Sequence, residues 1–115
     1  FLSGVGPRTA GSDVNDSGVP GLKLDHNGNF LEFDFEAQCR SVFDNVRAVL
    51  EASGSTWENL VDVTVFLVNM KRDFATYNRV YAEYFNDAQP CRTTVEINSL
   101  PTSIAIELKC IATVD

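Results

Sequence analysis

The sequence predicts an α+β fold in which two helices cover one face of a mixed β-sheet. The chain has 115 residues, below the roughly 250 at which a single core splits, so we expect one domain over residues 1–115. Two segments repeat apolar residues at intervals of three and four, which indicates helices, and others alternate in the manner of strands. The expected order is strand, long loop, helix, strand, helix, strand, strand. Such an order is typical of helices packed on one side of a sheet.

The start of the chain combines a short apolar segment with a long polar one. Residues 1–6 are predicted to form a strand, and residues 7–29 follow as a long loop insertion rich in Gly, Pro, Asp and Asn. Loops longer than about 12 residues are uncommon in compact domains and are often functional. This loop is therefore either a lid over a ligand or an ordinary surface excursion. The chain begins at Phe1 rather than Met, which leaves open a missing N-terminal segment.

Each predicted helix has an apolar face and a start signal. The first helix is predicted from Asp34, a residue type that caps helices, to Gly54, a C-terminal stop. Its apolar residues are Phe35, Cys39, Val42, Phe43, Val46, Val49 and Leu50. The second helix is predicted over residues 71–86, with Asp73 near the positive end of the helix dipole. Its apolar residues are Phe74, Tyr77, Tyr81, Tyr84 and Phe85.

Three later segments are predicted as strands, over residues 60–68, 91–98 and 104–114. The residues expected to face the helices are Val61, Val63, Val65 and Leu67, then Ile104, Ile106, Leu108, Cys110 and Ala112. Apolar side chains also fall on the other face, at Phe66, Val68 and Ile111. Because exposed apolar patches mark interfaces, we expect this second face to pack on neighbouring subunits in a closed homo-oligomer.

Charge and composition exclude several classes of protein. Nine Lys and Arg against sixteen Asp and Glu give a net charge of −7, which disfavours binding to nucleic acid. The sequence has no apolar run near the ~18 residues of a membrane span. Cys39, Cys91 and Cys110 form no CxxC motif and leave one thiol unpaired, so we expect reduced thiols in a cytoplasmic protein. Cys39 and Cys110 are expected in the core.

The same sequence offers no metal or cofactor motif. His26 is the one histidine, which argues against a multi-histidine metal site or a histidine-based triad. There is no GxGxxG and no GxxxxGK[ST] loop to cradle phosphates. We therefore expect no cofactor and no metal.

Two charged residues on predicted strands are candidates for chemistry. Arg92 lies on the polar face of its strand, and its planar fork suits bidentate binding of a carboxylate. Glu107 lies on the polar face of the next strand. If these strands pair across the turn at 99–103, the two side chains point to one site, where Glu107 serves as a general base for water. The alternative is a structural ion pair.

Three further residues are weaker candidates for a binding site. Asn78 interrupts the apolar face of the second helix, so its amide is either bonded to backbone or presented to a ligand. Ser3 and Gly4 end the first strand, where a glycine permits a ligand to approach the backbone closely. Cys91 adjoins Arg92, a cation of the kind that lowers the pKa of a thiol, but successive strand residues face opposite ways.

Taken together, the residues resemble the RidA/YjgF family of reactive-intermediate imine deaminases. The strongest likeness is the motif P-x-R-x-x-V-E-x-x-x-L-P, which spans residues 90–101 and is followed by Ile106-Glu107. Further matches are Phe1-Leu2-Ser3-Gly4, Phe43-Asp44-Asn45-Val46, Val63-Thr64-Val65-Phe66 and Asp73-Phe74-Ala75-Thr76-Tyr77-Asn78.

The resemblance implies a chorismate-mutase-like fold assembled as a homotrimer, with a central barrel of sheets and clefts between subunits. It implies that Arg92 binds a substrate carboxylate, Glu107 orients the hydrolytic water, and Asn78 with the Ser3-Gly4 backbone lines the cleft. Water would add to an imine, or to the imine tautomer of an enamine, and ammonia would leave. The resemblance implies no metal or organic cofactor.

Two departures from the typical family pattern bear on the substrate. Thr94 stands where typical imine deaminases carry Cys, and the loop after Ser3-Gly4 is longer. Both features look more like the 2-aminomuconate deaminase branch, in which Arg8 would pair with a second carboxylate. The alternatives are a general deaminase of 2-iminobutanoate and 2-iminopropanoate, or a non-catalytic ligand-binding member of the family.

Overall fold

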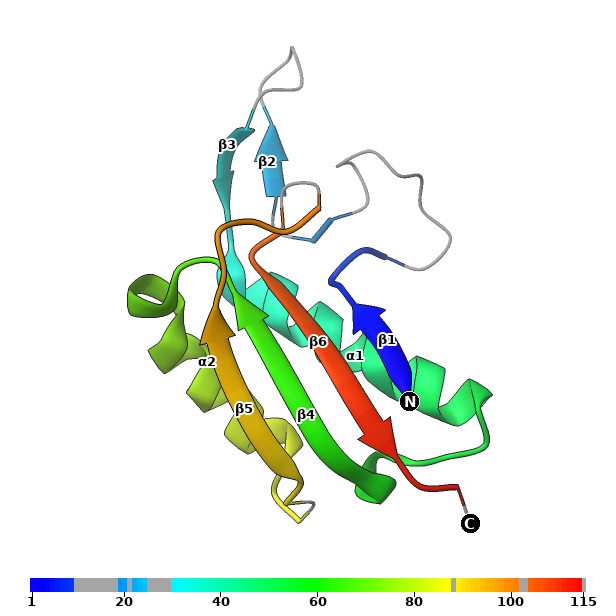
Figure 1. Ribbon diagram of the computed structural model, residues 1–115. Helices are drawn as coiled ribbons and strands as arrows, with labels where there is room; N and C mark the ends of the chain where they lie inside the picture. The colour runs from blue at the N-terminus through cyan, green and yellow to red at the C-terminus, as the bar shows by residue number, and fades with distance from the viewer. Residues whose placement is uncertain (10–18, 21, 25–29, 88, 102–103, 115) are drawn as a thin grey trace.

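The computed structural model describes residues 1–9, 19–20, 22–24, 30–87, 89–101 and 104–114 (Figure 1). Its elements are β1 (Leu2–Val5), β2 (Leu22–Leu24), β3 (Phe30–Phe33), α1 (Phe35–Ala52), a 3-10 turn (Trp57–Asn59), β4 (Leu60–Leu67), α2 (Met70–Tyr84), β5 (Cys91–Glu96) and β6 (Ile106–Ala112). No helix in this described part is long and apolar enough to cross a membrane.

The main sheet has four strands in the order β1-β6-β4-β5. Strand β6 runs antiparallel to both of its neighbours, β1 and β4, whereas β5 runs parallel to β4. Both helices lie on one side of this sheet, and no helix or strand of the described residues covers the other side (Figure 1). The predicted α+β class, with two helices on one face of a mixed sheet, is confirmed.

The last two strands do not pair with each other, so the condition for the convergence of Arg92 and Glu107 is not met. Strand β4 lies between β5 and β6, and each of them pairs with it rather than with the other. The physical reason is the crossover through α2, because a strand that returns through a helix runs parallel to the strand it left. Strand β5 thus occupies one edge of β4, and β6 pairs with the remaining edge.

A second small sheet joins β2 to β3 as an antiparallel pair. Strand β2 falls within residues 7–29, which the sequence pattern predicted as loop throughout. Its three residues are too few to show an alternation, because periodic patterns need about four or more residues to be read. Residues 10–18, 21 and 25–29, which include His26, lie outside the described residues.

The core lies between the helices and the covered face of the sheet. The aromatic rings of Phe43, Trp57, Tyr77, Tyr81, Tyr84 and Phe85 form a cluster within it. Trp57 is buried there, and its indole Nε1 donates a hydrogen bond of 2.7 Å to the carbonyl oxygen of Tyr84. This bond satisfies the one polar atom that the buried indole carries.

Some predicted core positions are corrected. Val49, Val61 and Phe74 are exposed, whereas Leu60, Val80 and Ala105 are buried. A register shift between Leu60 and Asp62 in the β4–β6 pair explains the exchange at the start of β4, because a bulge reverses which side chains face inward. The core positions predicted for Cys39 and Cys110 are correct.

Helix α1 begins and ends at its predicted signals, whereas α2 (Met70–Tyr84) begins one residue before the predicted range of 71–86, ends two residues before its end, and has a cap that was not predicted. The Asp34 side chain accepts a hydrogen bond from the backbone N–H of Ala37, and α1 ends just before Gly54, whose φ of +79° favours glycine. Asn69 caps α2 by accepting from the backbone N–H of Arg72 at 3.1 Å. Such caps satisfy N–H groups that have no partner within the helix.

Candidate functional site

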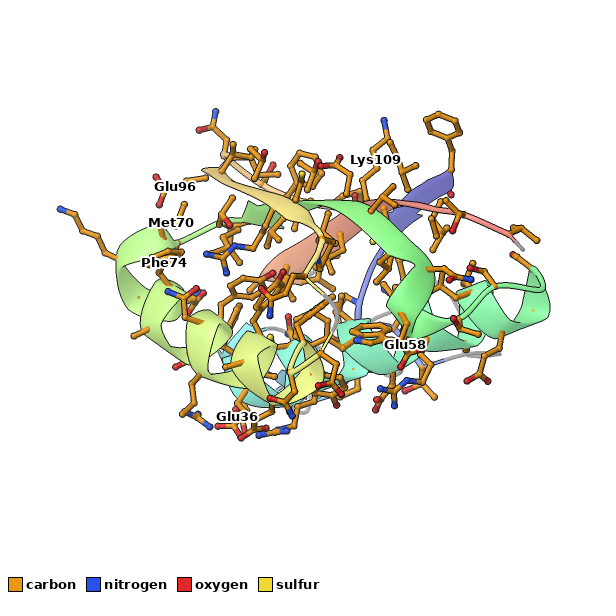
Figure 2. All side chains as sticks on the ribbon, turned by 90° about the horizontal axis from the view of Figure 1, so that it is seen from below. Glu36, Glu58, Met70, Phe74, Glu96 and Lys109 are labelled. Carbon is orange, nitrogen blue, oxygen red and sulfur yellow. The ribbon has the colours of Figure 1, made fainter. Side chains whose placement is uncertain are left out.

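Arg92 points from β5 toward helix α2. It pairs in register with Val63, which is buried under the helices, and paired residues of adjacent strands share a face. Glu96 lies four residues after Arg92 and therefore on the same face of β5. It accepts a hydrogen bond of 2.7 Å from the backbone N–H of Met70 at the start of α2 (Figure 2). The row of residues 92, 94 and 96 therefore faces α2.

The guanidinium of Arg92 is fixed by α2 on more than one side. Its Nη1 donates a hydrogen bond of 2.9 Å to Oδ1 of Asn78. Its Cζ lies 4.7 Å from the ring centre of Tyr81 and 5.5 Å from that of Tyr77, distances at which a cation is attracted to a ring face. The structure thus brings Asn78 and Arg92 together. The bond to Asn78 uses one of five guanidinium N–H groups, on a side chain that is exposed.

Two hydroxyl groups near Arg92 are buried. Neither Oγ1 of Thr94 nor the phenol oxygen of Tyr77 has a hydrogen-bond partner among the described residues. Burial raises the pKa of Tyr77 well above its usual value, and the nearby Arg92 cation opposes that rise only in part. The phenol therefore remains a hydrogen-bond donor. The sequence pattern indicated only an apolar role for Tyr77.

Glu107 lies on the opposite face of the sheet. It pairs with Phe66, which in turn pairs with Val95, and these residues alternate with the buried ones. Lys109, two residues along β6, points away from the helices in Figure 2, and Glu107 shares its face. Glu107 and Arg92 therefore do not meet within one chain, so the expected convergence of the two charges is wrong for a single chain.

Gly4 lies directly against the Glu107 carboxylate. A Cβ atom added to Gly4 would stand 2.4 Å from Oε2 of Glu107, well inside van der Waals contact. The carboxylate thus occupies the space that a side chain at position 4 would take, and any larger residue there would displace it. Ser3, the preceding residue, is exposed at the same end of the sheet. The structure thus brings Gly4 and Glu107 together, as a second cluster separate from Arg92 and Asn78.

The segment after β1 is anchored to helix α1. The side-chain amide of Asn45 donates to the carbonyl oxygens of Gly6 and Arg8 at 2.9 and 2.8 Å, and the Ser41 hydroxyl donates to that of Pro7 at 2.7 Å. The backbone of Arg8 is therefore fixed where the long connection begins. Asn45 belongs to a motif that the sequence analysis noted, but its anchoring role needs the tertiary structure to be seen.

The cysteines divide into two buried thiols and one exposed thiol. Desolvation raises the pKa of Cys39 to about 12 and that of Cys110 to about 11. Both stay protonated at neutral pH, which makes them poor nucleophiles. Cys91 is exposed and is offset by one residue from Arg92 along β5. Across the described residues, no three His, Cys, Asp or Glu side chains are gathered to hold a metal ion.

Known proteins match this chain along most of its length. The family model described as Endoribonuclease L-PSP matches residues 9–114. A RutC family protein of Pyrococcus horikoshii is 42% identical over 85 residues, covering 74% of this chain and 67% of that protein. Reactive Intermediate Deaminase A, chloroplastic, of Arabidopsis thaliana is 35% identical over 113 residues, covering 95% of this chain and 59% of that protein.

A solved structure also matches this chain along nearly all of its length. TdcF of E. coli with bound serine has a TM-score of 0.75 to this chain at 27% identity, covering 98% of this chain and 78% of that one. The chain spans 59 to 67% of the length of the two curated relatives above. The family model matches residues 9–114, which is nearly the whole chain. The chain therefore belongs to the Endoribonuclease L-PSP family, which is the RidA/YjgF family that its sequence resembles.

Proposed function

We propose that this protein hydrolyses the imine, or the imine tautomer of an enamine, of a small carboxylate to a carbonyl compound and ammonia. The observation that carries the proposal is the exposed Arg92 guanidinium, oriented by Asn78 and two tyrosine rings. A rigid guanidinium of this kind suits a carboxylate. Two relatives support the ligand class, because one is a Reactive Intermediate Deaminase and the other was solved with bound serine, an amino acid.

The proposed mechanism assigns one task to each residue. Arg92 binds the substrate carboxylate and fixes the C=N carbon. Glu107 orients a water molecule and accepts its proton as the water oxygen bonds to that carbon. The proton passes to the nitrogen as the C=N electron pair moves there, which gives a carbinolamine. Glu107 then takes the proton of the new hydroxyl group and returns it to the nitrogen, so that the C–N bond breaks, ammonia leaves and the carbonyl forms. Asn78 holds Arg92, and the backbone at Ser3 and Gly4 lines the cleft.

This mechanism needs two copies of the chain. Arg92 and Glu107 lie on opposite faces of one sheet, so a single chain cannot present both to one substrate. We propose a homotrimer with sites between subunits, in which Arg92 of one chain meets Glu107 of a neighbour. The open face of the sheet, with Phe66, Val95 and Ile111, supports this assembly because it carries partly exposed apolar side chains.

The proposed substrate is 2-aminomuconate or a related unsaturated amino dicarboxylate. Thr94 places a hydroxyl rather than a thiol near Arg92, and Arg8 is the candidate for the second carboxylate. A general deaminase of 2-iminobutanoate and 2-iminopropanoate is the second candidate, favoured by the Arabidopsis relative. A non-catalytic binding role is the third, favoured by the serine bound to the E. coli relative.

One assay separates these functions. Ammonia release is measured with enzymatically generated 2-aminomuconate and with 2-iminobutanoate, for wild type, Arg8→Ala and Glu107→Gln. Turnover of the dicarboxylate alone, lost in both variants, is the expected result. Lys71→Ala and Glu58→Gln, which change exposed charges elsewhere, are matched controls that retain activity.

The other outcomes are equally informative. Equal or faster turnover of 2-iminobutanoate, with Arg8→Ala unchanged, would identify the general deaminase and reject the dicarboxylate substrate. Absence of ammonia from both substrates, with carboxylate binding retained, would reject catalysis and leave the binding role.

A further inference from the structure

The hydroxyl of Tyr77 is a buried polar group to which the mechanism above assigns no task. Tyr77 is completely buried, and its phenol oxygen has no hydrogen-bond partner among the described residues. A buried donor without a partner costs free energy, and phenylalanine would fill the same space without that cost. Such groups in native proteins call for an explanation. A missing ligand or an ordered water would supply it.

The position of Tyr77 favours a ligand. Its ring centre lies 5.5 Å from Cζ of Arg92, and it stands one residue before Asn78, which bonds to the same guanidinium. On the facing strand, Oγ1 of Thr94 is a second buried hydroxyl without a partner in the described structure. Thr94 shares the face of β5 that carries Arg92. Two unpaired hydroxyls therefore accompany one exposed cation.

We propose that the Tyr77 hydroxyl donates a hydrogen bond to the same ligand carboxylate that Arg92 binds, and so selects carboxylates in this site. The inference rests on the proposed function and extends it by adding a specificity-determining residue. A carboxylate accepts several hydrogen bonds at once, so one oxygen can receive Arg92 and the other Tyr77. A neutral phenol adds recognition without a second positive charge.

The test measures affinity for stable carboxylates rather than turnover. Isothermal titration calorimetry gives the Kd of 2-oxobutanoate and of 2-oxoglutarate, one with a single carboxylate and one with two. Tyr77→Phe removes only the hydroxyl and is expected to weaken binding about tenfold, the size of a hydrogen bond to a charged group. Tyr84→Phe, a matched loss of a hydroxyl that bonds to Asp44 at the helix surface, is the control and should bind as wild type does.

A double-mutant cycle separates direct binding from a structural effect. If Tyr77 and Arg92 hold one carboxylate, Tyr77→Phe should have a smaller effect in an Arg92→Lys background than in wild type. Additive effects would overturn the proposal. So would a Tyr77→Phe variant that binds within twofold of wild type while its melting temperature rises, because the hydroxyl would then contact only buried water.

Binding by wild type distinguishes a failure of the proposed function from a failure of the Tyr77 proposal. If wild type binds neither carboxylate, both the function and this inference are wrong. If wild type binds and Tyr77→Phe binds equally well, only the inference is wrong.

Discussion

The contact between Gly4 and Glu107 predicts that a methyl group added at position 4 lowers activity. Gly4→Ala would place Cβ 2.4 Å from Oε2 of Glu107, so the carboxylate must move. We expect ammonia release to fall by about tenfold or more, because misplacing a catalytic group by about 1 Å has effects of this size or larger. Stability should not fall, since alanine is better tolerated than glycine within a strand.

Gly6 provides the matched control for that substitution. Among the described residues, a Cβ added there would meet Cδ1 of Ile104 alone, at 3.4 Å. Gly6→Ala should therefore retain turnover, as measured in the same steady-state assay and with the same thermal melt. Full activity of Gly4→Ala would contradict a role for the present position of Glu107.

The two buried thiols predict a loss of stability at alkaline pH. Their folded pKa values, about 12 for Cys39 and about 11 for Cys110, exceed the ordinary value of 9.0. The unfolded chain therefore releases these protons first, and stability that is fully present below pH 9.0 declines as pH rises toward the folded values. Each thiol contributes at most about 1.4 kcal/mol per pH unit.

Urea unfolding under reducing conditions, from pH 8 upward, checks this slope. Cys39→Val removes one titrating thiol and should give a shallower decline than wild type. An identical slope in the variant would show that Cys39 does not cause it.

Some residues of the candidate site could be predicted from the sequence and others could not. Asn78 stood out because it interrupts an apolar helix face, and Arg92 because its guanidinium on a strand suits a carboxylate. The structure places the two side chains in contact. Tyr77 did not stand out, because a tyrosine on a helical apolar stripe is ordinary core material. That its hydroxyl has no partner among the described residues can be seen only once the packing of α2 against β5 is known. The sequence of either element alone does not specify that packing.

Helix α1 depends on its N-terminal cap. Asp34 accepts a hydrogen bond from the backbone of Ala37, so Asp34→Ala should lower the free energy of unfolding by about 1 kcal/mol. Urea denaturation measures the change. Glu51→Ala is the contrasting control, because Glu51 lies in the last turn of α1, where a negative charge opposes the helix dipole. That variant should be as stable as wild type or slightly more so, and equal losses in both variants would argue against capping.

Elements differed in how readily their sequence identified them. Both helices were predictable since long periodic segments with caps carry a strong local signal. The strand partners of β5 and β6 were not predictable. A connection as long as residues 97–105 allows the two strands to be neighbours or to lie on either side of β4. Strands β2 and β3 were both missed, because three and four residues give patterns too short to distinguish from a loop. Local sequence specifies elements, and the order of strands depends on contacts between distant segments.

The proposed assembly makes a prediction that only the whole molecule can test. If Arg92 and Glu107 act from different chains, Arg92→Ala and Glu107→Gln should each be inactive alone. Co-refolded in equal amounts, they should regain about one quarter of wild-type ammonia release, because random assembly gives one site in four with both residues intact. This fraction does not depend on the size of a closed ring.

A site built within one chain gives the opposite result. No mixed assembly would then contain an intact pair, and the mixture would stay as inactive as the separate variants. Analytical ultracentrifugation of the mixture ensures that assembly has occurred, so that inactivity can be attributed to the site.

The strand order also has a consequence for how the protein is made. Strand β1 is synthesised before the other described strands, yet its partner in the main sheet is β6, the last of them. Until β6 leaves the ribosome, β1 is unpaired and β4 presents one open edge. Exposed strand edges invite pairing with other chains. The nascent polypeptide is therefore most prone to aggregate just before β6 emerges, when the other strands of the main sheet are already exposed and the one that closes the sheet is not yet available.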